Sequence, residues 1–450
     1  MIVPRPAHLR HGVLISYALP AIVFALPTIP VYIYLPALYG DHLGLGLTTV
    51  GLVLLCARIF DTVTDPIVGY LSDRVGFKGA LRKPWIIVGA LIGGLALFKV
   101  LSPPNIVSAA YLLIWSIILY GGWTMIAIPY VAWGAELSTD YAERTRITAW
   151  REGMGLIGIV GAAGLGTLAT SGRLGEISET QVIALAAVVL GIALLPLMVW
   201  LVPDRPIAIQ TESKGRLRVS FFRQIRSLLQ NKLFVRLLSV WLVNGIANGI
   251  PAALFFLYLS HGLGVDENAR SGFVLVYFIA AILAIPFWAV LSKRMGKHRT
   301  WCIAMGAACG GFSIVPFLAP GAVDVFAVVC VITGMSLGAD LILPPAIQAD
   351  VVDYDHLRNG SARTGQLFSL WAMATKLALA LSVGTALPLL EGMGFDAANP
   401  TERGRIALTV IYAGLPVVIK MMAIGAIWSF PLNARKHAII RRQLETRRKI

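Results

Sequence analysis

Charged residues are scarce in this chain: they make up 14% of its 450 residues, whereas apolar residues make up 57%. The mean hydropathy is +0.76. Soluble proteins carry about 25% charged residues, so this composition excludes a water-soluble enzyme. It predicts instead a protein embedded in a lipid bilayer.

Cysteines are also few, and the four present (Cys56, Cys302, Cys309 and Cys330) all lie inside apolar runs without metal-ligand spacing. We expect them to behave as small buried hydrophobic residues, which excludes a disulfide framework and a metal centre. The sequence also lacks a nucleophile–base pairing and a phosphate-binding loop. It therefore predicts neither an enzyme nor a bound cofactor.

What the chain does contain is a series of apolar runs, each of which is long enough to cross a bilayer core as a helix. The twelve runs have the approximate limits 14–39, 48–70, 85–101, 106–134, 150–170, 181–202, 236–260, 271–292, 300–319, 322–349, 364–391 and 406–430. A polar, basic stretch separates the first six from the last six. The pattern predicts an all-α membrane protein with an N-terminal bundle at 1–202, a cytoplasmic loop at 203–235, a C-terminal bundle at 236–430 and a basic cytoplasmic tail at 431–450.

The formal net charge of +15 does not indicate nucleic-acid binding, because the basic residues follow the membrane topology. The loops predicted to face outward hold only Arg173, Arg270, Arg403 and Arg405, whereas the inward loops and the tail are rich in lysine and arginine. This positive-inside bias places both termini in the cytoplasm. We expect a bacterial inner-membrane protein whose partners are the bilayer and a small-molecule substrate.

The two halves repeat each other weakly. Residues 71–76 and 291–296 carry similar sequences at corresponding places in the two halves, and so do the segments that follow Pro129 and Pro344. The offset is near 215 residues, with parallel topology. Such a repeat predicts two six-helix bundles with a substrate path between them.

Two carboxylates, Asp61 and Asp65, interrupt the second apolar run. A charged residue at that depth costs about 2.5–3.5 kcal/mol on the insertion scale. Arg58, Asp61 and Asp65 share one stripe of a helix, and this stripe must face protein or a water-filled cavity. One interpretation is a buried Arg58–Asp61 salt bridge that transports nothing. Because one arginine cannot neutralise two carboxylates, the pattern favours a cation site in a transporter.

Several short motifs occur in the order found in one known family. They are 58–69, 69–76, 82–85, 128–130, 136–146 and 349–355, followed by Lys376. In these segments the sequence resembles the glycoside–pentoside–hexuronide:cation symporters, the melibiose permease group of the major facilitator superfamily. The resemblance implies the major facilitator fold, with twelve transmembrane helices in two bundles, and cation-coupled transport.

The resemblance also implies a cation site between the second and fourth helices. Asp61 and Asp65 match its two carboxylates, Thr124 matches its hydroxyl, and Lys376 matches a lysine of the same charge network. Thr124 could instead bond to its own helix. Thr64 is a further candidate cation ligand, and Arg58 and Lys376 form the candidate coupling network. Near Thr64 the family has an asparagine, which puts sodium affinity in doubt. Two close carboxylates can also share a proton, so proton and sodium coupling both stay open, with the proton favoured.

The substrate site departs from the family. Ala25 and Ala127 occupy the positions of two sugar-binding carboxylates, whereas Arg151 matches a sugar-site arginine. Asp340 is a further carboxylate inside an apolar run. With Arg151, the candidate substrate-binding residues are Asp340, Tyr34, Tyr130, Asn244 and Asn248.

Charged residues of the inward loops form a candidate cytoplasmic gate. They are Asp73, Arg74, Asp140, Glu143, Arg144 and Arg146. A role in setting topology would account for the arginines but not for the acids. The favoured function is a proton- or sodium-coupled symporter of a sugar, glycoside or uronide. The alternatives are a symporter of an amphipathic molecule such as a lysophospholipid, and a membrane sensor that transports nothing. Oligomeric state, substrate and direction of flux stay open.

Overall fold

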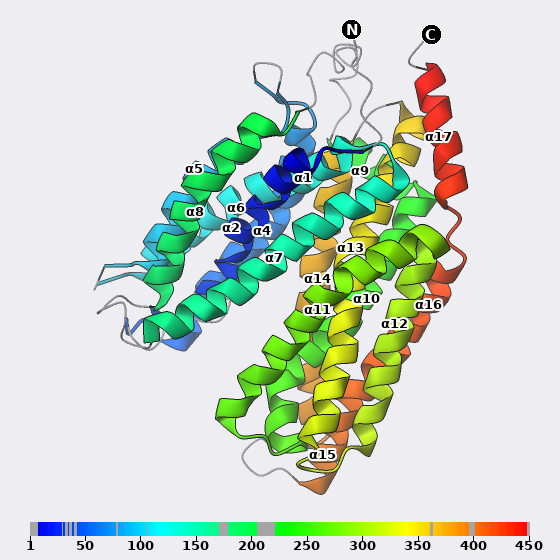
Figure 1. Cartoon of the computed structure of the whole chain (residues 1–450). Helices are drawn as coiled ribbons and strands as arrows, with labels where there is room; N and C mark the ends of the chain where they lie inside the picture. The colour runs from blue at the N-terminus through cyan, green and yellow to red at the C-terminus, as the bar shows by residue number, and fades with distance from the viewer. Residues whose placement is uncertain are drawn as a thin grey trace. The chain divides into compact units, whose positions relative to one another are not determined.

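The computed structural model describes residues 8–28, 30–31, 35, 38–39, 43–77, 80–104, 106–170, 179–204, 221–360, 363–395 and 401–447. Within these residues the chain is almost entirely helical (Figure 1). They also contain an isolated β-bridge between Phe77 and Ala80. The chain forms two compact units. Unit 1 comprises 1–223 and 358–370, and unit 2 comprises 224–357 and 371–450.

Unit 1 is built from a series of long helices after a broken first segment. They are α1 (His11–Ala18), α2 (Pro20–Ala25), α4 (Leu47–Ser72), α5 (Lys83–Leu101), α6 (Ala109–Leu137), α7 (Tyr141–Thr170) and α8 (Glu179–Leu201). The first break occurs at Pro20, which lacks the N–H that a helix interior requires. Helix α9 (Phe221–Leu229) begins at the end of this unit.

Unit 2 contains the remaining helices. They are α10 (Lys232–Leu257), α11 (Glu267–Met295), α12 (Lys297–Ile314), α13 (Val323–Asn359), α14 (Thr364–Gly392), α15 (Glu402–Thr409), α16 (Leu415–Trp428) and α17 (Ala434–Arg447). A π-helical turn, Val410–Gly414, joins α15 to α16. The end of α13 and the start of α14 belong to unit 1.

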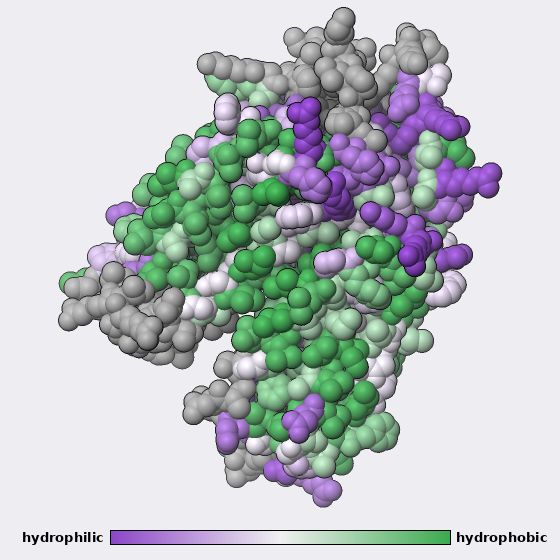
Figure 2. Space-filling view, in the orientation of Figure 1, coloured by the Kyte–Doolittle hydropathy of each residue, from purple (hydrophilic) through white to green (hydrophobic). Residues whose placement is uncertain are grey.

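The helices confirm the predicted fold class. Among the described residues, nine helices are long and apolar enough to cross a membrane. Helices α4 and α7 are also longer than a span requires, but each carries three or more charged residues. Figure 2 shows apolar side chains along the visible helices and hydrophilic side chains over α17. A bilayer would cover such apolar faces. The predicted domain limits stay a prediction.

Close packing of α5 on α6 fixes the helix that carries Thr124. A Cβ atom built on Gly122 would lie 2.6 Å from the backbone nitrogen of Gly93, and one built on Gly89 would lie 2.8 Å from Cβ of Met125. Small residues at such crossings let membrane helices approach closely. Glycine at these positions therefore holds α6 in place beside α5.

Candidate functional site

The predicted cation-site residues on α4 and α6 lie together in unit 1. The hydroxyl oxygen of Thr124 is 2.9 Å from Oδ1 of Asp61 and 3.0 Å from Oδ1 of Asp65. All three side chains are buried, with exposed fractions of 4% or less. The alternative in which Thr124 bonds to its own helix is therefore not what the structure contains. Three oxygens from two helices converge on one point, and oxygen is the ligand that hard cations prefer.

The other residues predicted for this network make contacts of their own. The hydroxyl of Thr64 donates to the backbone carbonyl of Asp61 at 3.0 Å, so it bonds to its own helix. The guanidinium of Arg58 lies over the ring of Tyr120, 4.7 Å from its centre. Lys376 is half-buried on the part of α14 that belongs to unit 2. Its approach to the α4 carboxylates stays a prediction.

A second charged cluster surrounds Asp73, directly after α4. Its carboxylate accepts hydrogen bonds from Arg82 at 2.7 Å, from the backbone N–H of Gly365 at 2.7 Å and from that of Gln366 at 3.0 Å. Burial raises the pKa of the Asp73 carboxyl, while the Arg82 guanidinium and the Gly365 N–H oppose that rise. The two backbone donors belong to the first turn of α14, where a carboxylate is stabilising. Asp73 thus ties the end of α4 to the start of α14.

Arg82 and Glu136 complete this cluster, although the sequence interpretation assigned them no role. The guanidinium of Arg82 donates to both carboxylate oxygens of Glu136, at 2.7 and 3.2 Å. All three charged side chains are buried. Both new residues lie inside the family motifs, at 82–85 and 136–146, so the signal was present in the sequence. What the sequence did not show was that one arginine bridges two acids.

The remaining residues of the predicted gate contact one another and the start of the chain, where the backbone N–H of Leu9 donates to Glu143 at 3.1 Å. Asp140 caps α7, accepting from the N–H groups of Ala142 and Glu143 at 2.9 and 2.8 Å, and Glu143 accepts from Arg146 at 2.8 Å. Arg144 donates to the carbonyl of Ser138 at 3.0 Å. The guanidinium of Arg74 makes a cation–π contact with Tyr70, 3.7 Å from the centre of its ring. A gating role for this group stays a prediction.

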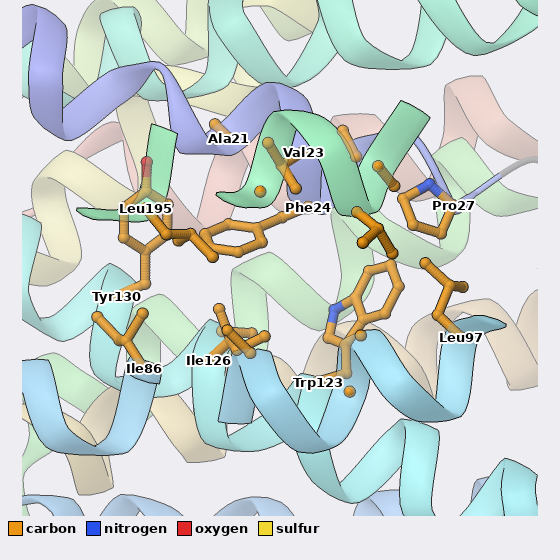
Figure 3. A pocket seen from close by; sticks show the side chains of 18 of the residues that line it. Ala21, Val23, Phe24, Pro27, Ile86, Leu97, Trp123, Ile126, Tyr130 and Leu195 are labelled. Atoms are coloured by element: carbon orange, nitrogen blue, oxygen red, sulfur yellow. The ribbon is translucent and has the colours of Figure 1, made fainter. Parts of the chain in front are cut away.

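Unit 1 contains an apolar cavity of about 800 Å³ that is partly open to its surface (Figure 3). Ala25 and Ala127, which replace the family's sugar-binding carboxylates, both line it. Its polar members include Tyr130, Arg151 and Glu152, and α2, α5, α6, α7 and α8 all contribute to its wall. Figure 3 shows Phe24, Ile126 and Trp123 lying between Tyr130 and Pro27. The cavity is therefore suited to an apolar group.

Two sequence-predicted residues supply the polar part of this cavity. Arg151 is buried and donates two hydrogen bonds to Glu152, one of them from Nε at 3.1 Å. The hydroxyl of Tyr130 donates to the carbonyl of Tyr17 at 2.6 Å, and Tyr17 returns a bond to Tyr130 at 3.0 Å. Arg151 thus has its charge balanced within the wall. Tyr34 lies outside the described residues.

Asp340 lies in a polar cluster of unit 2. Its carboxylate accepts from Trp301 Nε1 at 2.6 Å and from Asn248 Nδ2 at 2.8 Å, and Lys420 Nζ lies 3.6 Å away. Lys420 donates to Asn244 at 2.7 Å. Asn248 contacts Asp340 directly and Asn244 is linked to it through Lys420. Tyr130 and Arg151, predicted for the same site, line the unit 1 cavity instead. The substrate-binding role of all of them stays a prediction. Lys420 was missed, although a lysine within the apolar run 406–430 is a readable signal.

Comparisons with known proteins agree with this architecture. Residues 16–434 match the family described as MFS/sugar transport protein. The uncharacterized symporter YjmB of Bacillus subtilis (strain 168) is 24% identical over 91% of this chain and 89% of its own length. The sodium-dependent lysophosphatidylcholine symporter 1-B of Danio rerio is 24% identical over 88% of this chain and 82% of its own.

Solved structures resemble the fold at low identity. A bacterial homologue of the iron transporter ferroportin, in an outward-facing state, has a TM-score of 0.69 at 14% identity and covers 94% of this chain and 99% of its own. The proton:xylose symporter XylE has a TM-score of 0.65 at 13% identity and covers 94% and 96%. These likenesses concern fold alone. From the match over nearly its whole length, the chain belongs to the MFS/sugar transport family of the major facilitator superfamily, whose members are membrane transporters and not enzymes.

Proposed function

We propose that this protein is a cation-coupled symporter of a sugar, glycoside or uronide that works by alternating access. The observation that carries the proposal is the convergence of Asp61, Asp65 and Thr124 in a buried site of unit 1. If this site served only to pack helices together, placing two carboxylates on one hydroxyl would not stabilise the protein.

The chemistry of this site requires a positive charge. A threonine hydroxyl carries one proton and can donate only one hydrogen bond at a time. Two ionised carboxylates that both approach its oxygen to about 3 Å also repel each other. Either a proton shared by the carboxylates or a monovalent cation between the oxygens relieves both problems. Thr64 bonds to its own helix at the carbonyl of Asp61 and offers no amide oxygen where the family has an asparagine, which favours the proton over sodium.

Lys376 is the second part of the coupling hypothesis. An ammonium at membrane depth requires a carboxylate partner, and the family resemblance pairs it with the α4 acids. Without a bound cation, Lys376 would balance their charge; with a cation bound, it would be released. Such an exchange would make the state of the substrate path depend on cation occupancy.

A matched pair of threonines tests the cation site. Thr124→Ala removes a hydroxyl that contacts both carboxylates, whereas Thr62→Ala removes a hydroxyl that bonds only to the carbonyl of Arg58, at 2.9 Å. In proteoliposomes, uptake of radiolabelled methyl galactoside and glucuronate is measured under an imposed proton or sodium gradient. We expect Thr124→Ala to reduce gradient-driven accumulation about tenfold, as loss of a charge-assisted bond would. Equal accumulation by both variants would contradict the proposed site.

An amphipathic substrate is the second candidate, and a specific observation favours it. The unit 1 cavity is apolar, and its volume of about 800 Å³ is within the range for a drug-sized ligand. Its wall includes Leu91 and Ile192, which are 71% and 72% exposed on the apolar outside of α5 and α8. A relative named for lysophosphatidylcholine supports the same interpretation. Uptake of lysophosphatidylcholine without uptake of any sugar would replace the first candidate with this one.

A further inference from the structure

The Asp340 cluster borders a second cavity, which belongs to unit 2. This cavity has a volume of about 220 Å³, and both Asp340 and Lys420 line it. Its wall also contains Asn248 and several aromatic side chains, among them Tyr277 and Phe256. Phe256 is 54% exposed, so the cavity reaches the surface of the unit beside α10. A buried charged pair that borders an accessible cavity can contact a ligand.

Two donors of the cluster are not fully used by its acceptors. The ammonium of Lys420 has three N–H groups, and within the described part of the chain its acceptors are Asn244 at 2.7 Å and Asp340 at 3.6 Å. The amide nitrogen of Asn244 is buried and has no acceptor among the described residues. Buried polar groups in proteins are usually satisfied. The cluster can therefore accommodate further oxygen atoms.

A nearby ion pair of the same type lacks these features. Lys297 and Asp350 are both 1% exposed and lie 2.5 Å apart, and Lys297 also donates to the carbonyl of Ala346 at 3.2 Å. Neither residue lines the 220 Å³ cavity. The short distance is that of a pair in direct contact. At 3.6 Å, the ammonium of Lys420 and the carboxylate of Asp340 are more loosely joined, beside open space.

We propose that the unit 2 cavity binds one sugar ring of the substrate, with a ring hydroxyl bridging Lys420 and Asp340. This inference rests on the proposed function and names the substrate class of unit 2. A hydroxyl accepts from an ammonium and donates to a carboxylate at the same time. The charges of Lys420 and Asp340 cancel, so the site favours a neutral ligand. The volume is below the 300–1,000 Å³ range of drug-sized ligands, which matches a single ring.

Binding without any gradient tests the inference separately from coupling. The full chain in nanodiscs is titrated with radiolabelled D-xylose, methyl β-D-galactoside and L-alanine, and thermal unfolding is followed in parallel. We expect Lys420→Met to weaken binding of at least one sugar about tenfold or more. Lys297→Met, the matched control, breaks a buried pair away from the cavity and should leave the affinity of the folded protein unchanged. Equal affinity in both variants would overturn the inference.

The double variant Asp340→Asn/Lys420→Met keeps the test decisive if the single variant unfolds, because it leaves no uncompensated charge. Recovered stability with sugar affinity still lost supports the ring site. Recovery of both stability and affinity would mean that the pair only packs helices. Competition by L-alanine alone would mean that the ligand is a zwitterion. Either result would overturn the inference. If sugar binding depends on Lys420 but no gradient drives accumulation, the proposed coupling fails and the ring site stands.

Discussion

Two candidate sites, one in each unit, differ in their balance of buried charge. In unit 1, the carboxylates of Asp61 and Asp65 converge on the hydroxyl of Thr124, so two acids meet at one oxygen atom. In unit 2, the carboxylate of Asp340 is matched by the ammonium of Lys420. An excess of carboxylate oxygen favours a cation, whereas a balanced pair favours a neutral hydroxylated molecule. The contrast teaches that cation and substrate can be recognised by different units.

The cavities differ in the opposite sense. The larger one, in unit 1, has an apolar wall in which Arg151 is already paired with Glu152, and the smaller one, in unit 2, has Asp340 and Lys420 in its wall. A sugar ring would use the second, and a hydrocarbon chain the first.

The largest effect is expected for Asp65→Cys. This variant should abolish accumulation against a gradient, because the site loses one of its two carboxylates. Downhill exchange of the same substrate should persist, since neither cavity has Asp65 in its wall. Both are measured in proteoliposomes, with and without an imposed ion gradient. Loss of exchange together with accumulation, in protein of normal thermal stability, would mean that the carboxylate contacts substrate.

A comparison of Arg151→Ala with Asp340→Asn tests which unit holds the substrate. Each removes a buried charged hydrogen-bonding group, and such a bond is worth about 1.5–3 kcal/mol, so we expect about a tenfold or greater loss of affinity. For sugars, Asp340→Asn should have the larger effect, and for lysophosphatidylcholine, Arg151→Ala. Equilibrium binding to purified protein gives both values. If both variants bind substrate normally, neither cavity is the recognition site and the cation site is unaffected.

The sequence predicted more of unit 1 than of unit 2. The spacing of Asp61 and Asp65 placed both acids on one helix face, where burial is costly, and the family resemblance alone added Thr124. Lys420 and Trp301 were missed because their contacts join α16 and α12 to α13, and no local spacing records which helices pack together. Arg82 was overlooked for the same reason: its two acids come from separate parts of the chain.

A smaller, several-fold effect is expected for Asp73→Asn. The amide keeps one acceptor but loses the charge that pairs with Arg82 and faces the first turn of α14. We expect the labelling rate of a cysteine introduced at Ala127, in the unit 1 cavity, to change. The labelling experiment uses protein in which Cys56 is replaced by serine, because Cys56 is exposed and would react with the probe, whereas the other three cysteines are buried. Unchanged labelling from both sides of the membrane would mean that Asp73 serves stability or topology alone.

The smallest effect is expected for Thr64→Asn, and it bears on the identity of the ion. The hydroxyl of Thr64 donates to the carbonyl of Asp61 on its own helix, and threonine has no amide oxygen that could reach a cation between the carboxylates. An asparagine at position 64, three residues after Asp61, adds a carbonyl oxygen on a longer side chain. We expect it to increase sodium-driven uptake relative to proton-driven uptake by a few fold. Thr62→Asn, on the same helix but bonded to Arg58, is the matched control. Uptake ratios are measured with sodium and proton gradients of equal size. If the ratio rises equally in both variants, the added amide acts through the helix in general, and the oxygen set at Asp61, Asp65 and Thr124 does not select the ion.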